Sequence, residues 1–99
     1  MSLAGKTAIV TGAGRGLGKA IGLGLASCGA DVVLASRTLA ELAAVADECR
    51  SFGVRAEPLV TDITASDQCD KLVQFCVSRF GKLDIAVCNA RIGIHNGVC

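Results

Sequence analysis

Short apolar runs alternate along the chain with longer segments in which apolar residues recur at intervals of three and four. The runs predict β-strands and the periodic segments predict amphipathic helices. Because the connections are short, the alternation predicts a parallel α/β sheet. Pro58 has no amide hydrogen to donate, so the strand that contains it is predicted at a sheet edge. We expect strands at residues 7–10, 32–35, 54–60 and 83–88, with a helix in each interval between them.

Turn and cap residues set the expected helix bounds. The first helix is predicted to begin near Gly16 and to end at Gly29, since glycine commonly follows a last helical turn. The second follows Thr38, which with Glu41 three residues later forms the pattern of a capping box. The third begins around Ser66. The faces expected to pack on the sheet are Leu17, Ala20, Ile21, Gly24, Leu25 and Cys28 in the first helix, Leu39, Leu42, Ala43 and Ala46 in the second, and Cys69, Leu72, Val73, Cys76, Val77 and Phe80 in the third.

A glycine-rich stretch, T-G-A-G-R-G-L-G at residues 11–18, joins the first strand to the first helix. Glycines let a backbone approach phosphates closely, and a helix N-terminus offers free N–H groups and partial positive charge. The pattern is not G-x-G-x-x-G, because Leu17 stands at its last position, and it is not a nucleoside-triphosphate loop, because Ala20 follows Gly-Lys. The stretch predicts a diphosphate site; the alternative is a glycine-rich turn without a ligand.

The spacing T-G-x-x-x-G-x-G, with glycines at 12, 16 and 18, resembles the short-chain dehydrogenase/reductase family, whose loop is one residue longer between its first two fixed glycines. The resemblance implies part of a Rossmann-type doubly wound sheet, βαβαβαβ, with strand order 3-2-1-4 and the ligand at the switch point between strands one and four. It implies one truncated dinucleotide-binding domain over residues 1–99, without the catalytic and substrate-binding half. The expected cofactor contacts of the loop are Thr11, Gly12, Gly14, Arg15, Gly16, Leu17 and Gly18.

The end of the second strand bears on which dinucleotide binds. Family members that prefer NAD usually place a carboxylate there for the ribose hydroxyls, whereas an arginine pairs with the 2′-phosphate of NADP. This chain has Ser36 and Arg37 at that point, and Arg15 projects from the glycine loop. We therefore expect NADP rather than NAD. The alternative is that both arginines are solvated surface charges.

Two further segments match the family. Asp62 and Ile63 follow the third strand, where the family flanks the adenine ring, although Asp62 could instead begin a turn. After the fourth strand the family has N-N-A-G, and here only Asn89 and Ala90 match. The resemblance implies that this segment bonds to Thr11 and lines the ribose site. Arg91 replaces a glycine at a ligand wall, which puts close approach of the cofactor in doubt.

The family transfers hydride between alcohols or carbonyls and its nicotinamide cofactor, with a tyrosine, a lysine four residues later and a serine. This chain contains no tyrosine. We expect the cofactor-binding part of an NAD(P)-dependent oxidoreductase that is inactive as this chain, and no catalytic residue is assigned. The alternatives are a nonenzymatic NADP-binding module or partner subunit, or an inert truncation product. The family usually forms homo-oligomers, and a small alcohol or carbonyl substrate is expected only with the missing half.

Composition narrows the remaining classes. The chain is 52% apolar with 12 glycines, which fits a sheet covered on both faces. Its formal net charge of +1 has no basic run, so neither nucleic acid nor an anionic membrane is an expected partner. No apolar run is long enough for a membrane span, and no signal peptide is visible. Six irregularly spaced cysteines without C-x-x-C, and a single histidine, predict neither a metal site nor a disulfide scaffold, but buried thiols in a reducing cytoplasm.

Overall fold

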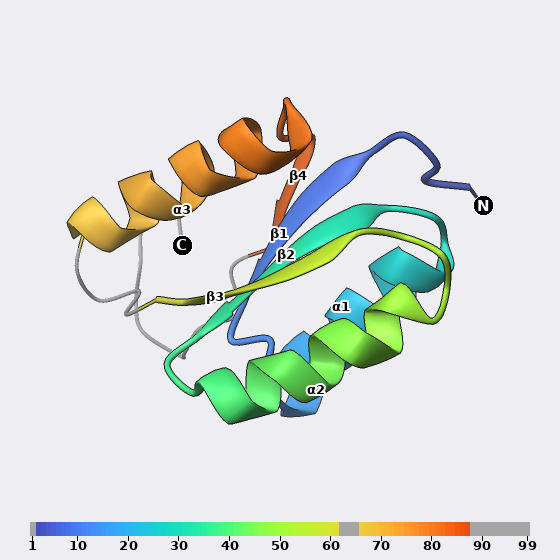
Figure 1. Cartoon of the computed structure of the whole chain (residues 1–99), viewed down its shortest axis with the longest axis horizontal. Coiled ribbons are helices and arrows are strands. Elements are labelled where there is room, and N and C mark those ends of the chain that lie inside the picture. The colour runs from blue at the N-terminus through green and yellow to red at the C-terminus, as the bar shows by residue number, and fades with distance from the viewer. Residues whose placement is uncertain (1, 62–65, 88–99) are drawn as a thin grey trace.

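A computed structural model of the chain describes residues 2–61 and 66–87 and shows a four-stranded parallel sheet (Figure 1). The strands are β1 (Thr7–Thr11), β2 (Asp31–Ser36), β3 (Ala56–Val60) and β4 (Ile85–Val87). Their order, β3-β2-β1-β4, confirms the predicted 3-2-1-4 arrangement and puts Pro58 on an edge strand. Each connection between successive strands contains a helix, as parallel pairing requires.

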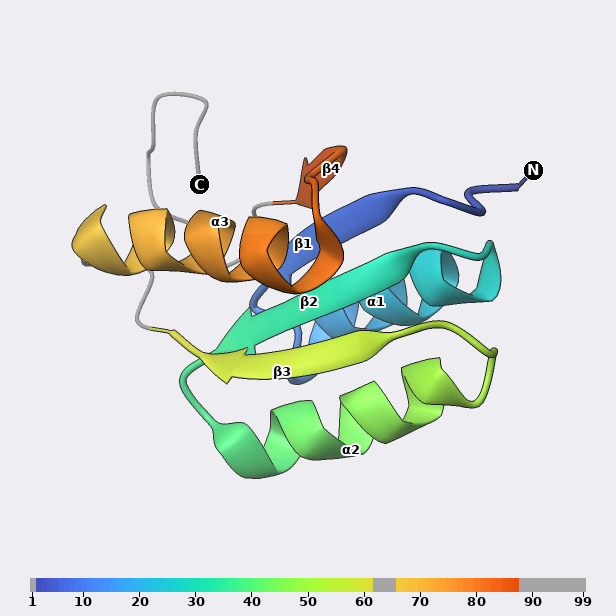
Figure 2. The ribbon, with the colours of Figure 1, turned by 45° about the horizontal axis from the view of Figure 1, so that its top comes forward.

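The helices cover both faces of the sheet. They are α1 (Gly16–Ser27), α2 (Leu39–Arg50) and α3 (Ser66–Phe80). Figure 2 shows α1 and α2 on one face and α3 on the other. The central strands β1 and β2 are therefore buried on both sides, which explains why their sequences are unbroken apolar runs. Among the helices of residues 2–61 and 66–87, none has the length and apolar character needed to cross a bilayer.

The inner face of α1 differs from the prediction. The buried residues are Gly18, Gly22 and Ala26, whereas Leu17 is 67% exposed. Of the predicted face, Ile21 and Leu25 are partly buried and pack against the core, whereas Ala20 and Gly24 are exposed. Directly over β2, α1 lies too close to the sheet for a large side chain. A Cβ atom at Gly22 would lie 3.0 Å from Cδ2 of Leu34. The fully buried stripe of α1 is therefore one of small residues. Of Gly22 and Gly24, only Gly22 is in close contact with the sheet.

The other two helices keep part of their predicted faces. In α2 the buried stripe is Leu42, Val45, Ala46 and Cys49, and the predicted Leu39 and Ala43 are exposed. In α3, Leu72 and Cys76 are buried, but Val73 and Val77 are each 44% exposed. Both predictions made the apolar stripe too wide, because a helix lying on a sheet buries only the residues along its line of contact.

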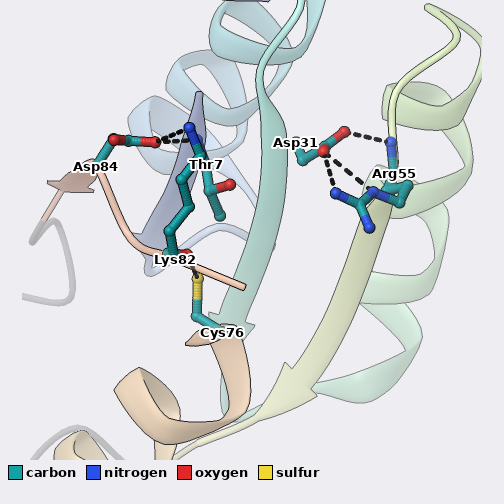
Figure 3. Close-up of polar contacts among 6 residues, drawn as sticks. All are labelled: Thr7, Asp31, Arg55, Cys76, Lys82 and Asp84. Atoms are coloured by element: carbon teal, nitrogen blue, oxygen red, sulfur yellow. Dashed lines mark hydrogen bonds and ion pairs between the residues drawn. The ribbon is translucent and has the colours of Figure 1, made fainter. Parts of the chain in front are cut away.

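Polar side chains join the strands at their amino ends, at the edge of the sheet opposite the glycine loop (Figure 3). The Thr7 N–H donates to the Asp84 carboxylate at 2.9 Å, and this bond lowers the pKa of Asp84. Asp31 accepts hydrogen bonds from the backbone and the guanidinium of Arg55, at 2.8–3.0 Å. These bonds take up the N–H groups of Thr7 and Arg55, at the start of β1 and just before β3, where the ladder begins.

Candidate functional site

The glycine loop lies at the carboxyl edge of the sheet, where β1 ends and α1 begins. Its backbone is fixed to the neighbouring strand, because the Ala13 N–H donates to the Ala35 carbonyl at 3.1 Å. Ala13 is fully buried in the core beneath the loop. The next strand end on the same edge is Ser36. The loop and the end of β2 therefore form one continuous surface.

The glycines of the loop each meet a different structural demand. Gly12 and Gly16 have φ near +63°, a left-handed conformation that other residues rarely adopt. Gly14 has an ordinary φ but no room for a side chain, since a Cβ atom there would lie 2.8 Å from Oε1 of Glu41. Gly18 is buried on the inner side of α1. Gly12 and Gly16 thus permit the turns of the loop, whereas Gly14 leaves room for the Glu41 side chain.

The N-terminus of α1 is open toward the loop. Its cap residue, Arg15, is extended and makes no side-chain cap hydrogen bond, and the first turn contains no acidic residue. The first turn of α1 therefore has no acidic side chain of its own against its amide hydrogens and the positive end of the helix dipole, and the neighbouring carboxylate is that of Glu41 from α2, beside Arg15. Leu17, in the same turn, is exposed beside them. This combination suits a bound phosphate group.

Thr11, at the end of β1, links the loop to β4. Its hydroxyl donates to the Val87 carbonyl at 3.3 Å, and the residue is buried. The sequence predicted Thr11 as the partner of the segment after the fourth strand, and Val87 is the last residue of β4. The bond therefore joins the two strands at the predicted switch point.

A basic surface with one carboxylate continues from the loop to the end of β2. Arg15 and Arg37 are exposed, and no described residue forms an ion pair with Arg37. Nε of Arg15 lies 3.8 Å from Oε2 of Glu41. The Ser36 hydroxyl accepts a hydrogen bond from the Thr38 N–H at 3.2 Å. Ser36 and Glu41 both border Gly14, Arg15 lies beside Glu41, and Arg37 follows Ser36 in the chain.

Glu41 is a site residue that the sequence reasoning assigned to another role. The predicted capping box is wrong, because Thr38 is the N-cap of α2 but makes no side-chain cap hydrogen bond. The Glu41 side chain instead turns toward Gly14 and Arg15. A signal was available in the topology: α1 and α2 both begin at the carboxyl edge, so their first turns meet.

Four predicted contacts, Asp62, Ile63, Asn89 and Ala90, lie outside the described residues. Within the described ranges there is no group of His, Cys, Asp or Glu side chains that could hold a metal ion. Cys49 and Cys76 are buried there as free thiols, and burial raises the pKa of both. They behave as small apolar core residues.

Comparison with known proteins matches the chain to one family model. The model described as short chain dehydrogenase covers residues 6–98. An uncharacterized oxidoreductase of Mycobacterium tuberculosis is 49% identical over 85% of this chain and 32% of its own length. The chain spans about a third of the length of the curated relatives it matches.

Solved structures agree in fold but differ in their bound cofactor. The L-sorbose reductase of Gluconobacter frateurii, complexed with NADPH and L-sorbose, is similar with a TM-score of 0.87 and 35% identity over 99% of this chain and 38% of that one. A 7α-hydroxysteroid dehydrogenase complexed with NADH and 7-oxo glycochenodeoxycholic acid has a TM-score of 0.82 and 39% identity over 86% of this chain and 33% of that one.

Proposed function

The chain belongs to the short-chain dehydrogenase/reductase family, and we propose that it is the NADP-binding part of an oxidoreductase of that family. The observation that carries the proposal is the loop between β1 and α1. Its left-handed glycines and uncapped helix N-terminus leave a surface of backbone N–H groups at the carboxyl edge of a parallel sheet. Ligands of open α/β sheets bind at that edge, at the switch point of the strand order.

We assign each loop residue a separate role in binding a diphosphate. Gly12 and Gly16 permit the turn, and Gly14 lets the Glu41 side chain pack against the loop. The first-turn amides of Gly16, Leu17 and Gly18 would donate to phosphate oxygens. Thr11 would hold β4 against β1 beside the ribose site.

Selectivity for NADP follows from charge at the end of β2. A 2′-phosphate carries negative charge, and Arg37 and Arg15 are exposed cations that follow Ser36 and Gly14 in the chain. Oγ of Ser36 borders Gly14. Related structures contain either NADPH or NADH, so the phosphate preference must be argued from these side chains. Arginine pairs with phosphate through two parallel N–H donors, and the Ser36 hydroxyl adds a further polar contact.

Other contacts are proposed from the family alone. Asp62 and Ile63 would flank the adenine ring, and Asn89 and Ala90 would line the ribose site. When bound, the cofactor supplies or accepts the hydride for an alcohol or carbonyl substrate. The chain has no tyrosine to transfer the accompanying proton, so we propose that these 99 residues bind the dinucleotide but do not turn over substrate. A nonenzymatic NADP-binding module is the second candidate, favoured by the same loop and the same lack of tyrosine.

Binding of NADPH and NADH to this chain tests the proposal directly. We expect NADPH to bind more tightly and to raise the melting temperature, since a ligand of the folded state stabilises it. Arg37→Ala should weaken the binding of NADPH about tenfold or more and leave the affinity for NADH nearly unchanged. Lys71→Ala removes an exposed cation on α3, away from the loop, and is the matched control. NADH binding tighter than NADPH, or no binding of either, would contradict the proposal.

A further inference from the structure

The carboxylate of Glu41 lies where the glycine loop, the end of β2 and the start of α2 meet. Its Oε1 is 2.8 Å from the point where a Cβ of Gly14 would stand, and Oγ of Ser36 is 3.3 Å from the same point. Its Oε2 is 3.8 Å from Nε of Arg15. One acidic side chain therefore contacts both the predicted phosphate loop and one of the two arginines expected to meet a 2′-phosphate.

We propose that Glu41 is a selectivity-determining residue that competes with the 2′-phosphate of NADP for Arg15 and so limits the preference for NADP over NAD. The inference rests on the proposed function, because it concerns selectivity at the same site. NADP must draw Arg15 away from Glu41 or bind beside an uncompensated carboxylate, and both reduce the gain from the extra phosphate. NAD has only hydroxyls at that position and incurs neither cost.

The arrangement allows this competition without rearrangement of the fold. The Arg15 side chain is 86% exposed, so it is free to turn from Glu41 to a ligand. Exposed ion pairs at this separation are weak, so Glu41 modulates the affinity for NADP and does not abolish it. The Thr38 N–H, to which a capping carboxylate at Glu41 would bond, donates instead to the Ser36 hydroxyl at 3.2 Å.

The test is the ratio of dissociation constants for NADPH and NADH in Glu41→Gln. Glutamine keeps the size of the side chain and removes its charge. Compared with wild type, we expect this variant to bind NADPH roughly three- to tenfold more tightly. Its dissociation constant for NADH should change less than about twofold. In an Arg15→Ala background the gain should largely disappear. The gain should also shrink at high salt, because exposed charges are screened.

A matched control is available on the same helix. Glu48 also pairs with a cation of α1, since its Oε2 lies 3.6 Å from Nζ of Lys19, but it is two turns further along α2. Glu48→Gln should leave both dissociation constants unchanged. If wild type binds neither dinucleotide, the proposed function fails and this inference with it. If wild type binds NADPH but Glu41→Gln matches Glu48→Gln, or the full gain persists without Arg15, only this inference is overturned.

Discussion

Gly22 of α1 packs directly against Leu34 of β2, with 3.0 Å between Cδ2 of Leu34 and the position of an added Cβ. Leu34 is fully buried, so it has little freedom to move aside. We predict that Gly22→Ala lowers the free energy of unfolding by about 1 kcal/mol, because overpacking outweighs the better helix propensity of alanine. Unfolding in urea, monitored by circular dichroism, measures this change in the free energy of unfolding.

Gly24, two residues along, is the control for that prediction. It is exposed, and no atom lies within 4 Å of its added Cβ. Gly24→Ala should therefore raise the free energy of unfolding by about 0.5–1 kcal/mol through helix propensity alone. Equal stabilisation by both substitutions would show that α1 has room against the sheet.

Alanine substitutions at Gly16 and Gly53 distinguish the effect of backbone strain on stability from the effect of the glycine loop on ligand binding. Gly16 and Gly53 both have positive φ, +63° and +87°, and neither has an atom within 4 Å of an added Cβ. Alanine at either position should cost about 1 kcal/mol of stability, because the strain is similar. Only Gly16→Ala should also weaken NADPH binding, since Gly53 lies beyond the far end of α2. Titration of both variants checks this, and equal loss of affinity in both would argue against a phosphate site at the loop.

Much of the fold was predictable from local pattern. The apolar runs of β1 and β2 identify central strands and Pro58 identifies an edge, whereas the strand order came from the resemblance to the family. The inner face of α1 was not predictable in the same way. Hydrophobicity favours Leu17 as a buried residue, and only the distance between helix and sheet reveals that Gly22 is the one in contact.

In the candidate site, too, some residues could be predicted from the sequence and others could not. Gly12 and Gly16 could be assigned from sequence, because positive φ has a residue preference. Glu41 could not, because a local pattern with Thr38 predicted a capping box, and the contact with Arg15 joins residues from different helices. Spacing identifies interactions within one element, whereas this interaction depends on how α1 and α2 lie on the sheet.

Asp84 should make stability depend on pH. The Thr7 N–H bond and the neighbouring Lys82 hold the pKa of Asp84 below its ordinary value of 3.8. A carboxyl with a lowered folded pKa stabilises the fold above its unfolded pKa, and the contribution is lost as pH falls through the folded value. Asp84→Asn should therefore be less stable than wild type near neutral pH, and the difference should narrow below about pH 4. Unfolding in urea at several pH values measures this difference.

Asp47→Asn is the control for that experiment. Among the contacts of the described residues, the Asp47 carboxylate bonds only to the exposed Arg50 side chain on its own helix. The same substitution there changes net charge equally but removes no bond to the sheet. If the difference in the free energy of unfolding from wild type narrows in the same way for both variants at low pH, net charge and not the Thr7 bond accounts for the pH dependence.

The thiols provide a test of the packing on both faces of the sheet. Cys49 is buried on the inner face of α2 and Cys76 on the inner face of α3, while Cys28, just after α1, is partly exposed. Burial raises the pKa of Cys49 and Cys76, so little reactive thiolate forms near neutral pH, and the surrounding side chains block access. Native alkylation mapped by mass spectrometry should modify Cys28 at least about tenfold faster than either buried thiol. In denaturant the three rates should become similar, and rapid native labelling of Cys76 would mean that α3 does not stay packed on the sheet.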